Sequence, residues 1–270
     1  MPATAATRPP AVAGMFYPGE ADALRAEIGA CLAAAHPPRL TPKALIVPHA
    51  GYIYSGPVAA HAYALLVPLA ERIRRVVLIG PAHRVALPGL GLPSVDAFAT
   101  PLGTVTLDRL ACAQALALPQ VHIDDLSHLP EHALEVQLPF LQSVLSEFTL
   151  VPFTVGYASA EAVAAVIEAL WGGCETLIIV SSDLSHYHSY RDAQRFDRET
   201  ADSLCRLQLL TDHEQACGAT PINGLILAAR RRGLKPHLLD LRNSGDTAGD
   251  RARVVGYIAM AFTAGEEDDA

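Results

Sequence analysis

The segment TLIIVSSDLSHYH, residues 176–188, changes from a continuous apolar stretch to a group of ionisable side chains. An apolar, β-branched run without alternation is typical of a strand that is covered on both faces. Asp183, His186 and His188 follow this run directly. In an open α/β sheet, ligands bind beyond the carboxyl ends of the strands. The alternative is an ordinary surface loop, which is polar because it is solvated. The segment therefore predicts an α/β protein and raises the question of whether other strands end in the same way.

Other apolar segments of the chain repeat this character. They are ALIVP from residue 44, RVVLIG from 75, FTLVPFTVG from 148, RVVGYIAMAF from 253 and, more weakly, PHLLDL from 236. Helical patterns fall between them, at residues 21–35, 57–66, 130–145, 158–173, 191–210 and 221–232. Alternating strands and helices predict a three-layer α/β sandwich with a central β-sheet and helices on both faces. We expect a single domain over residues 1–270, with flexible tails at 1–8 and 264–270.

Composition excludes several classes of function. The formal net charge is -8 and the basic residues are scattered, which disfavours nucleic-acid binding. No apolar stretch approaches the roughly 18 residues that a membrane span needs, and the N-terminal sequence does not resemble a secretory signal. Five cysteines without C-x-x-C spacing do not suggest a disulfide framework. We therefore expect a cytoplasmic protein that acts on a small molecule or a peptide.

Two further predicted strands end in histidine. His49 follows ALIVP, and His83 follows RVVLIG. A single such imidazole is as often a loop cap as a ligand, but neutral imidazoles brought together from separate loops are common transition-metal ligands. Gly51, with Tyr52 and Tyr54 beside it, is expected to line the same pocket, because glycine allows close approach of the backbone to a ligand.

Two more segments carry candidate groups. In LPEHALEVQLP, Glu131, His132 and Glu135 lie near an expected helix start. We assign His132 and Glu135 to the site, and leave Glu131 open between the site and a first-turn carboxylate that the helix dipole stabilises. Cys217 precedes another helix start, where a thiolate is favoured, although a free cysteine is more often a small buried residue.

These motifs together resemble the Memo family. The matching segments are RPPAVAGMFYP, PHAGYIYSGPVAAHAY, VVLIGPAH, EHALEVQLPFL, SSDLSHYH, CGATPI, and NSGD followed by VVGYIAMAF. They run in order over nearly the whole chain. The resemblance implies a fold like that of class III extradiol dioxygenases, and its prokaryotic members often accompany a radical SAM enzyme and an AMMECR-like protein as partners.

The resemblance also implies roles for individual residues. The family's metal ligands correspond to His49, His83 and Cys217. Asp183 and His186 would line the same pocket, and His132 and Glu135 would form a further polar wall. The dioxygenases hold ferrous iron with two histidines and a carboxylate, whereas a thiolate here also suits copper or zinc.

The first functional hypothesis is a non-haem Fe(II) protein that performs redox or oxygen-dependent chemistry on a small molecule. In it His186 is the acid/base, oriented by Asp183, whose carboxylate accepts a hydrogen bond from an imidazole N–H. The alternatives are a binding or adaptor module with a vestigial pocket, a copper or iron store, and a metal-free hydrolase that uses Cys217 with His186.

Overall fold

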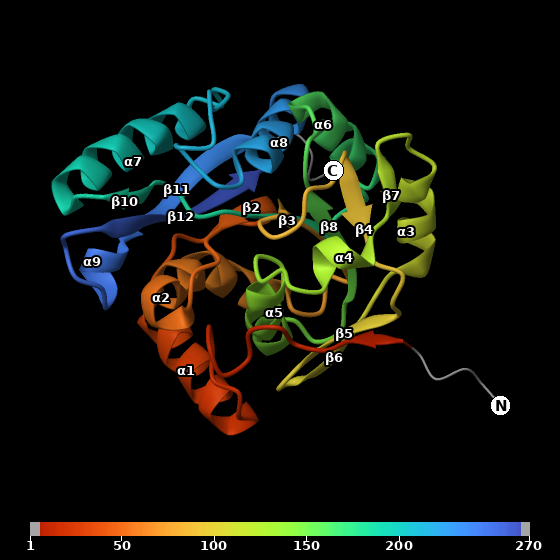
Figure 1. Ribbon diagram of the computed structural model, residues 1–270, viewed down its shortest axis with the longest axis horizontal. Coiled ribbons are helices and arrows are strands. Elements are labelled where there is room, and N and C mark those ends of the chain that lie inside the picture. The colour runs from red at the N-terminus through yellow and green to blue at the C-terminus, as the bar shows by residue number, and fades with distance from the viewer. Residues whose placement is uncertain (1–5, 266–270) are drawn as a thin grey trace.

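The computed structural model describes residues 6–265 and has a mixed central sheet (Figure 1). Nine strands form it within this range, in the order β10-β12-β2-β9-β3-β8-β4-β7, with β11 paired to β12. Their bounds are β2 Pro42–Val47, β3 Arg75–Pro81, β4 Leu90–Leu92, β7 Val121–Ile123, β8 Thr149–Val155, β9 Thr176–Ser181, β10 His186–His188, β11 Lys235–Asn243 and β12 Val254–Thr263. The central strands β2, β9, β3 and β8 are parallel neighbours, so their carboxyl ends share one edge.

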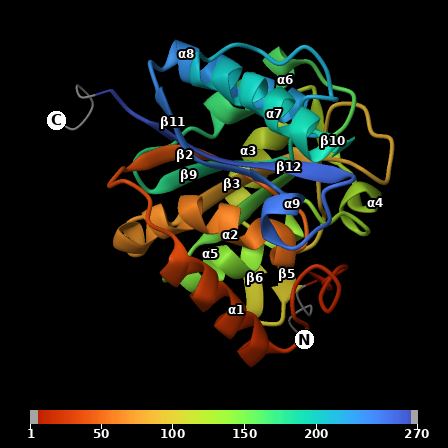
Figure 2. The ribbon, with the colours of Figure 1, turned by 90° about the vertical axis from the view of Figure 1, so that its left-hand side faces the viewer.

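Helices cover both faces of this sheet. Their bounds are α1 Ala21–Ala34, α2 Tyr52–Tyr63, α3 Arg109–Leu116, α4 Asp125–His128, α5 Leu138–Val144, α6 Ala160–Ala169, α7 Tyr190–Cys205, α8 Ala219–Arg231 and α9 Ser244–Thr247. Figure 2 shows α7 and α8 on one side of the sheet and α1, α2 and α5 on the other. The three-layer α/β arrangement predicted from the sequence is confirmed.

The continuous apolar strands are explained by these two layers. Along β2, Leu45 and Val47 belong to the core under α1, α2 and α5, while Ala44 and Ile46 belong to the core under α6 and α8. Successive side chains of a strand point to opposite faces, so a strand covered twice needs apolar residues at every position.

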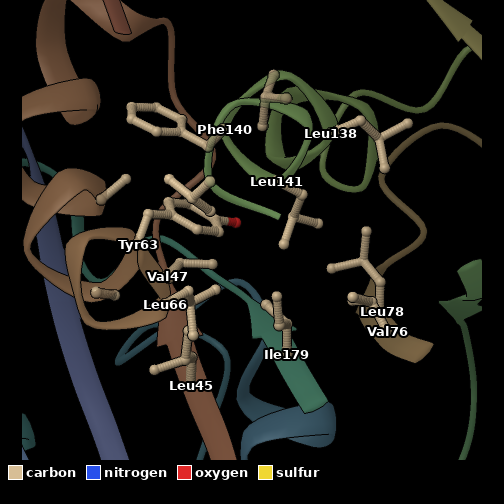
Figure 3. Close-up of a cluster of buried hydrophobic side chains, with 14 of the residues drawn as sticks. Leu45, Val47, Tyr63, Leu66, Val76, Leu78, Leu138, Phe140, Leu141 and Ile179 are labelled. Atoms are coloured by element: carbon tan, nitrogen blue, oxygen red, sulfur yellow. The ribbon is translucent and has the colours of Figure 1, made fainter. Parts of the chain in front are cut away.

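The core beneath α2 and α5 is closed by aromatic packing (Figure 3). The rings of Tyr63 and Phe140 stack with centroids 4.9 Å apart, and both side chains are fully buried. The Tyr63 hydroxyl donates to Gln137 Oε1 at 2.7 Å. This bond satisfies a polar group that burial would otherwise leave unpaired, and it places the Gln137 amide beside the end of β2.

Two helices differ from their predicted bounds. The helix expected over residues 57–66 begins at Tyr52 and continues as a 3-10 helix, η1, over Ala64–Leu69. The helix expected over residues 130–145 is a turn followed by a short 3-10 helix, η2, over Glu135–Gln137 and then α5. In that turn Glu131 accepts the backbone N–H groups of His132 and Ala133, so these amides bond to a side chain.

A second small sheet was not predicted. Strand β1, Thr7–Arg8, pairs with β5, Ala97–Thr100, which pairs with β6, Gly103–Thr106. The expectation of a flexible tail over residues 1–8 is therefore wrong for Thr7 and Arg8, and Arg8 is buried. Residues 1–5 and 266–270 of the two expected tails lie outside the described residues. In the described range, no helix has the length and apolar character needed to cross a membrane.

Candidate metal centre

Three adjacent strands deliver polar residues to the same edge of the sheet. His49 lies two residues beyond β2, His83 two beyond β3, and Asp183 two beyond β9. Because these strands are parallel neighbours in the order β2-β9-β3, their following loops converge. His132 joins this group from the turn that precedes α5.

Three imidazoles lie close enough to share one metal ion. One ring nitrogen from each of His49, His83 and His132 lies within 4.8 Å of the others. The ring centroids are 5.0 to 5.3 Å apart. Imidazole nitrogens are common ligands of transition metals, so the group could hold such an ion.

The hydrogen bonds of Ser181 decide which nitrogen of His49 carries a proton. The Ser181 hydroxyl donates its single hydrogen to the Ala133 carbonyl at 2.7 Å and accepts from Gln137 Nε2 at 2.9 Å. Its oxygen can therefore only accept from His49 Nδ1, which lies 3.0 Å away. The lone pair of the neutral His49 ring is then on Nε2, which is free to bind a metal.

A buried carboxylate orients His83. Glu131 Oε1 lies 2.9 Å from His83 Nδ1, and Oε2 accepts the His83 backbone N–H at 2.7 Å. Burial alone would raise the pKa of Glu131, but the hydrogen bonds and charge of His83 and the amide donors lower it to about 2. The ionised carboxylate accepts the Nδ1 proton, which leaves Nε2 of His83 to bind a metal. The Nδ1 atom of His132 is also close to this carboxylate, at 3.3 Å.

The electrostatics keep two of the imidazoles neutral. Burial, with a contribution from the nearby His83, lowers the pKa of His49 to about 3. Burial and the charge of His49 lower the pKa of His132 to about 4. Metal binding requires the unprotonated ring, so at neutral pH these two groups need lose no proton to bind an ion.

Cys217 lies beside His49 but outside the three-imidazole group. Its Sγ atom is 3.3 Å from His49 Nε2 and 3.7 Å from the Asp183 carbonyl. The expectation that the helix start favours a thiolate does not hold for the metal-free protein, because burial and the charge of Asp183 raise the pKa of the thiol to about 12. The protonated thiol has one hydrogen to donate, either to the His49 lone pair or to the Asp183 carbonyl, and it must lose that proton to bind a metal.

Contrary to expectation, no imidazole N–H within the described residues donates a hydrogen bond to Asp183. Its Oδ1 accepts the backbone N–H of His49 at 2.8 Å, and its Oδ2 lies 4.0 Å from His49 Nε2, which has no hydrogen to give. Burial raises the pKa of Asp183 above its ordinary value. His186, in β10, is close enough for its charge to act on Asp183 and on His49. His188 instead packs against Phe196, with ring centroids 5.5 Å apart.

Glu135 bonds away from the imidazoles, in a separate buried network. It pairs with Arg8 at 2.7 Å and accepts the Tyr17 hydroxyl at 2.7 Å and the backbone N–H groups of Ala11 and Val12. The assignment of Glu135 to the site is corrected in favour of Glu131.

Tyr52 and Tyr54, which follow β2 and were expected to line the pocket, lie in different environments. The ring of Tyr52 packs against Tyr17 and Phe140, and its hydroxyl donates to the Val136 carbonyl, so it belongs to the core. Tyr54 is exposed, and Gly51 forms the N-cap of α2. A Cβ atom at Gly51 would lie 3.4 Å from the Phe16 carbonyl oxygen. Gly51 therefore packs against the backbone of the N-terminal segment.

Buried neutral histidines should make the free energy of unfolding depend on pH. One of them, His128, lies outside the three-imidazole group. Its Nε2 donates to the Gly91 carbonyl, and its Nδ1 makes no hydrogen bond within the described residues. Burial lowers the pKa of His128 to about 4. The unfolded chain binds this proton near pH 6.5, so the stabilisation is complete above pH 6.5 and is lost as pH falls toward 4.

We expect the free energy of unfolding of the metal-free protein to fall over that window, with His128 alone contributing on the order of 3 kcal/mol. Urea titrations at a series of pH values measure this. The curve should be flatter for His128→Gln than for wild type, and parallel curves would contradict the assignment.

Comparison with known proteins identifies the family to which the chain belongs. The model of the family described as Memo-like protein matches residues 8–261. A MEMO1 family protein of Aquifex aeolicus is 37% identical over 272 residues, covering 94% of this chain and 98% of that protein. Those of Methanosarcina acetivorans and Sulfolobus acidocaldarius are 37% and 33% identical, again over 94% of this chain and over 98% and 99% of their own lengths. Since the family model and these relatives extend over nearly all of the sequence, this chain belongs to the Memo family.

Proposed function

We propose that the protein binds a transition-metal ion, ferrous iron in the first place, and uses it in oxygen-dependent redox chemistry on a small molecule. The observation that carries the proposal is the pair of oriented imidazoles. His49 and His83 each have Nδ1 hydrogen-bonded to a fixed acceptor, Ser181 and Glu131, which leaves Nε2 for an ion. Such outer partners are typical of protein metal sites.

The donor set fits a transition metal rather than calcium or magnesium. Neutral imidazoles suit iron, copper and zinc, whereas the alkaline-earth ions prefer oxygen ligands. Cys217 would be the third ligand beside His49 and His83. Its sulfur lies 3.3 Å from His49 Nε2, close to the separation of about 3.5 Å that follows from metal–sulfur and metal–nitrogen bonds in a tetrahedral site. His132 is then left to contact the substrate.

A bound ferrous ion would supply one-electron chemistry and an open position for oxygen or substrate. The protein would supply the rest. Asp183, whose pKa is raised by burial, has its Oδ2 atom 4.0 Å from His49 Nε2. His186 exchanges protons between this carboxyl group and the substrate. Glu131 keeps His83, and through its amide bonds the turn that carries His132, in position.

A second candidate function, a store or carrier of copper, is favoured by one observation, the contact between a thiol and an imidazole nitrogen at 3.3 Å. Sulfur ligands suit cuprous copper. The metal-free hydrolase is disfavoured, because a cysteine nucleophile acts as the thiolate and the raised pKa of about 12 keeps Cys217 protonated.

The Cys217→Ser variant tests the third ligand. We expect it to lose Fe(II) affinity by about ten-fold or more, because a weakly acidic hydroxyl replaces a soft anionic donor. Wild-type protein should release more protons on loading than the variant, since only its thiol ionises. Anaerobic competition against a chelator measures affinity, and a weakly buffered titration measures protons.

The matched control is Cys174→Ser, at an exposed cysteine far from the imidazoles in the sequence. It should bind iron as wild type does. Affinity and proton release unchanged in Cys217→Ser would remove Cys217 from the ligand set. Affinity for cuprous copper far above that for ferrous iron would favour the store.

A further inference from the structure

A cavity of about 480 Å³ lies at the opposite edge of the sheet from the imidazoles. Its walls include Pro42 and Lys43 at the start of β2, Thr176 at the start of β9 and Thr263 at the end of β12. In Figure 2 the labels of β2 and β11 lie on the left, while β10, which carries His186, lies on the right. The cavity is therefore separate from the candidate metal centre.

The charge of the cavity is opposite to that of the whole chain. Four cationic residues line it, Arg39, Lys43, Arg72 and Arg232, and the described lining residues include no aspartate or glutamate. The chain as a whole has a formal net charge of -8. Such a local concentration of one sign in a concave site attracts anions.

Two of these cations remain available to a ligand. Within residues 6–265, the guanidinium groups of Arg39 and Arg232 make no hydrogen bond or ion pair, and that of Arg232 lies over the Trp171 ring at 4.9 Å. A guanidinium group presents donors in a fork that matches the oxygens of a carboxylate or phosphate.

Lys43 forms a fixed part of the wall. Its ammonium group donates to the carbonyls of Trp171, Gly173 and Thr176, and it lies 5.2 Å from the centre of the Trp171 ring. Burial lowers the pKa of Lys43 to about 8, so the group still carries its charge at neutral pH. Its positive charge is thus built into the cavity and does not depend on a mobile side chain.

The rest of the wall is apolar. Leu40, Leu69, Ile73, Leu234 and the ring of Trp171 line the cavity, and Ile73 and Leu234 are nearly fully buried. A volume in this range is typical of sites for small molecules, which combine apolar walls with a few placed polar groups.

We propose that this cavity binds a small organic anion, with a phosphate or carboxylate group held by Arg39 and Arg232 and an apolar body against Trp171 and Leu234. The site is independent of the metal centre and of the function proposed for it.

The single tryptophan of the chain makes this site directly observable. Trp171 is the only tryptophan, so its fluorescence reports on this cavity alone. Three probes separate the contribution of the charged group from that of the apolar chain: inorganic phosphate, hexyl phosphate and hexanol. We expect a saturable change with hexyl phosphate, at least about ten-fold weaker binding of inorganic phosphate, and no saturation with hexanol, because each buried methylene adds to binding but the charge is required.

The decisive variant is Arg39→Gln with Arg232→Gln. It should weaken hexyl phosphate binding by about ten-fold or more, since both guanidinium contacts are lost. The control is Arg191→Gln with Arg195→Gln in α7, which changes the net charge equally and should leave binding unchanged. Absence of saturable binding to wild type, or equal affinity in the two double variants, would overturn the proposal.

The same carboxylate chemistry is present in the chain itself, because Gly265 in the cavity wall is followed in sequence by EEDD. Replacing these four residues with their amides distinguishes the two sources of anion. Unchanged or modestly altered hexyl phosphate affinity supports a ligand from outside. Saturable binding that appears only in the amide variant would show that the chain supplies its own anion, and would overturn the external ligand.

Discussion

Replacing Glu131 with glutamine should lower the affinity for Fe(II) by about 10- to 100-fold or more, the usual cost of losing an outer partner of a ligating histidine. Both oxygens of Glu131 accept N–H groups, from the ring and backbone of His83 and from the amides of His132 and Ala133. A glutamine must turn its own N–H₂ group toward one of these donors. The tautomer of His83 with its proton on Nδ1 is then less stabilised, so Nε2 is less available to the ion.

Anaerobic chelator competition measures this loss, under conditions in which circular dichroism shows both proteins folded. The matched control is Glu135→Gln, a change of the same chemistry four residues away in a carboxylate that contacts Arg8 instead of an imidazole. The control should retain iron at wild-type affinity while folded. Equal affinity of Glu131→Gln and wild type would show that Glu131 has only a structural role.

The second large effect concerns stability. Arg8→Met or Glu135→Gln should each cost about 3–5 kcal/mol of unfolding free energy, the usual cost of leaving one member of a buried ion pair without its partner. Arg8 is 4% exposed and Glu135 is fully buried. Arg8 also donates to the carbonyls of His128 and Glu131, so it ties the N-terminal segment to the turn that carries Glu131.

The double variant Arg8→Met with Glu135→Gln should cost less than the sum of the two single changes, because neither charge is left alone. Urea unfolding curves for the two singles and the double complete this cycle. Strict additivity would show that the two groups do not depend on one another in the folded protein.

The sequence predicted which edge of the sheet carries the imidazoles, because that edge follows from strand identity alone. The runs at 44, 75 and 176 are long and apolar, and residues directly beyond parallel strands must share one edge. His49, His83 and Asp183 could therefore be placed together without coordinates. The short strands β1, β4 and β7 have two or three residues each, too few for any periodicity to be read.

The wrong assignment of Glu135 to the site has a local cause. A helix through residues 130–145 would place these two carboxylates on one face, since residues four apart are neighbours there. The chain instead turns at 131–134, and the two side chains bond to different parts of the protein. Glu131 and Ser181 are the two residues that orient the imidazoles. In the sequence, Glu131 was visible only as a polar residue beside a histidine, and Ser181 only as the last residue of a strand.

Tyr52 and Cys217 show a second limit. Tyr52 was expected in the pocket, but α2 begins at this residue, which places its ring in the core. For Cys217 the sequence showed the helix start but not the burial, and burial dominates the pKa of the thiol. Both outcomes depend on packing between distant segments, which local patterns do not encode.

X-ray absorption at the iron edge of the anaerobically loaded protein tests the central claim most directly, namely that the Nε2 atoms of His49 and His83 bind one ion. We expect one ion per chain, with imidazole nitrogens in its first shell and one sulfur neighbour at about 2.3 Å. A first shell of oxygen atoms without imidazole scattering would contradict the account.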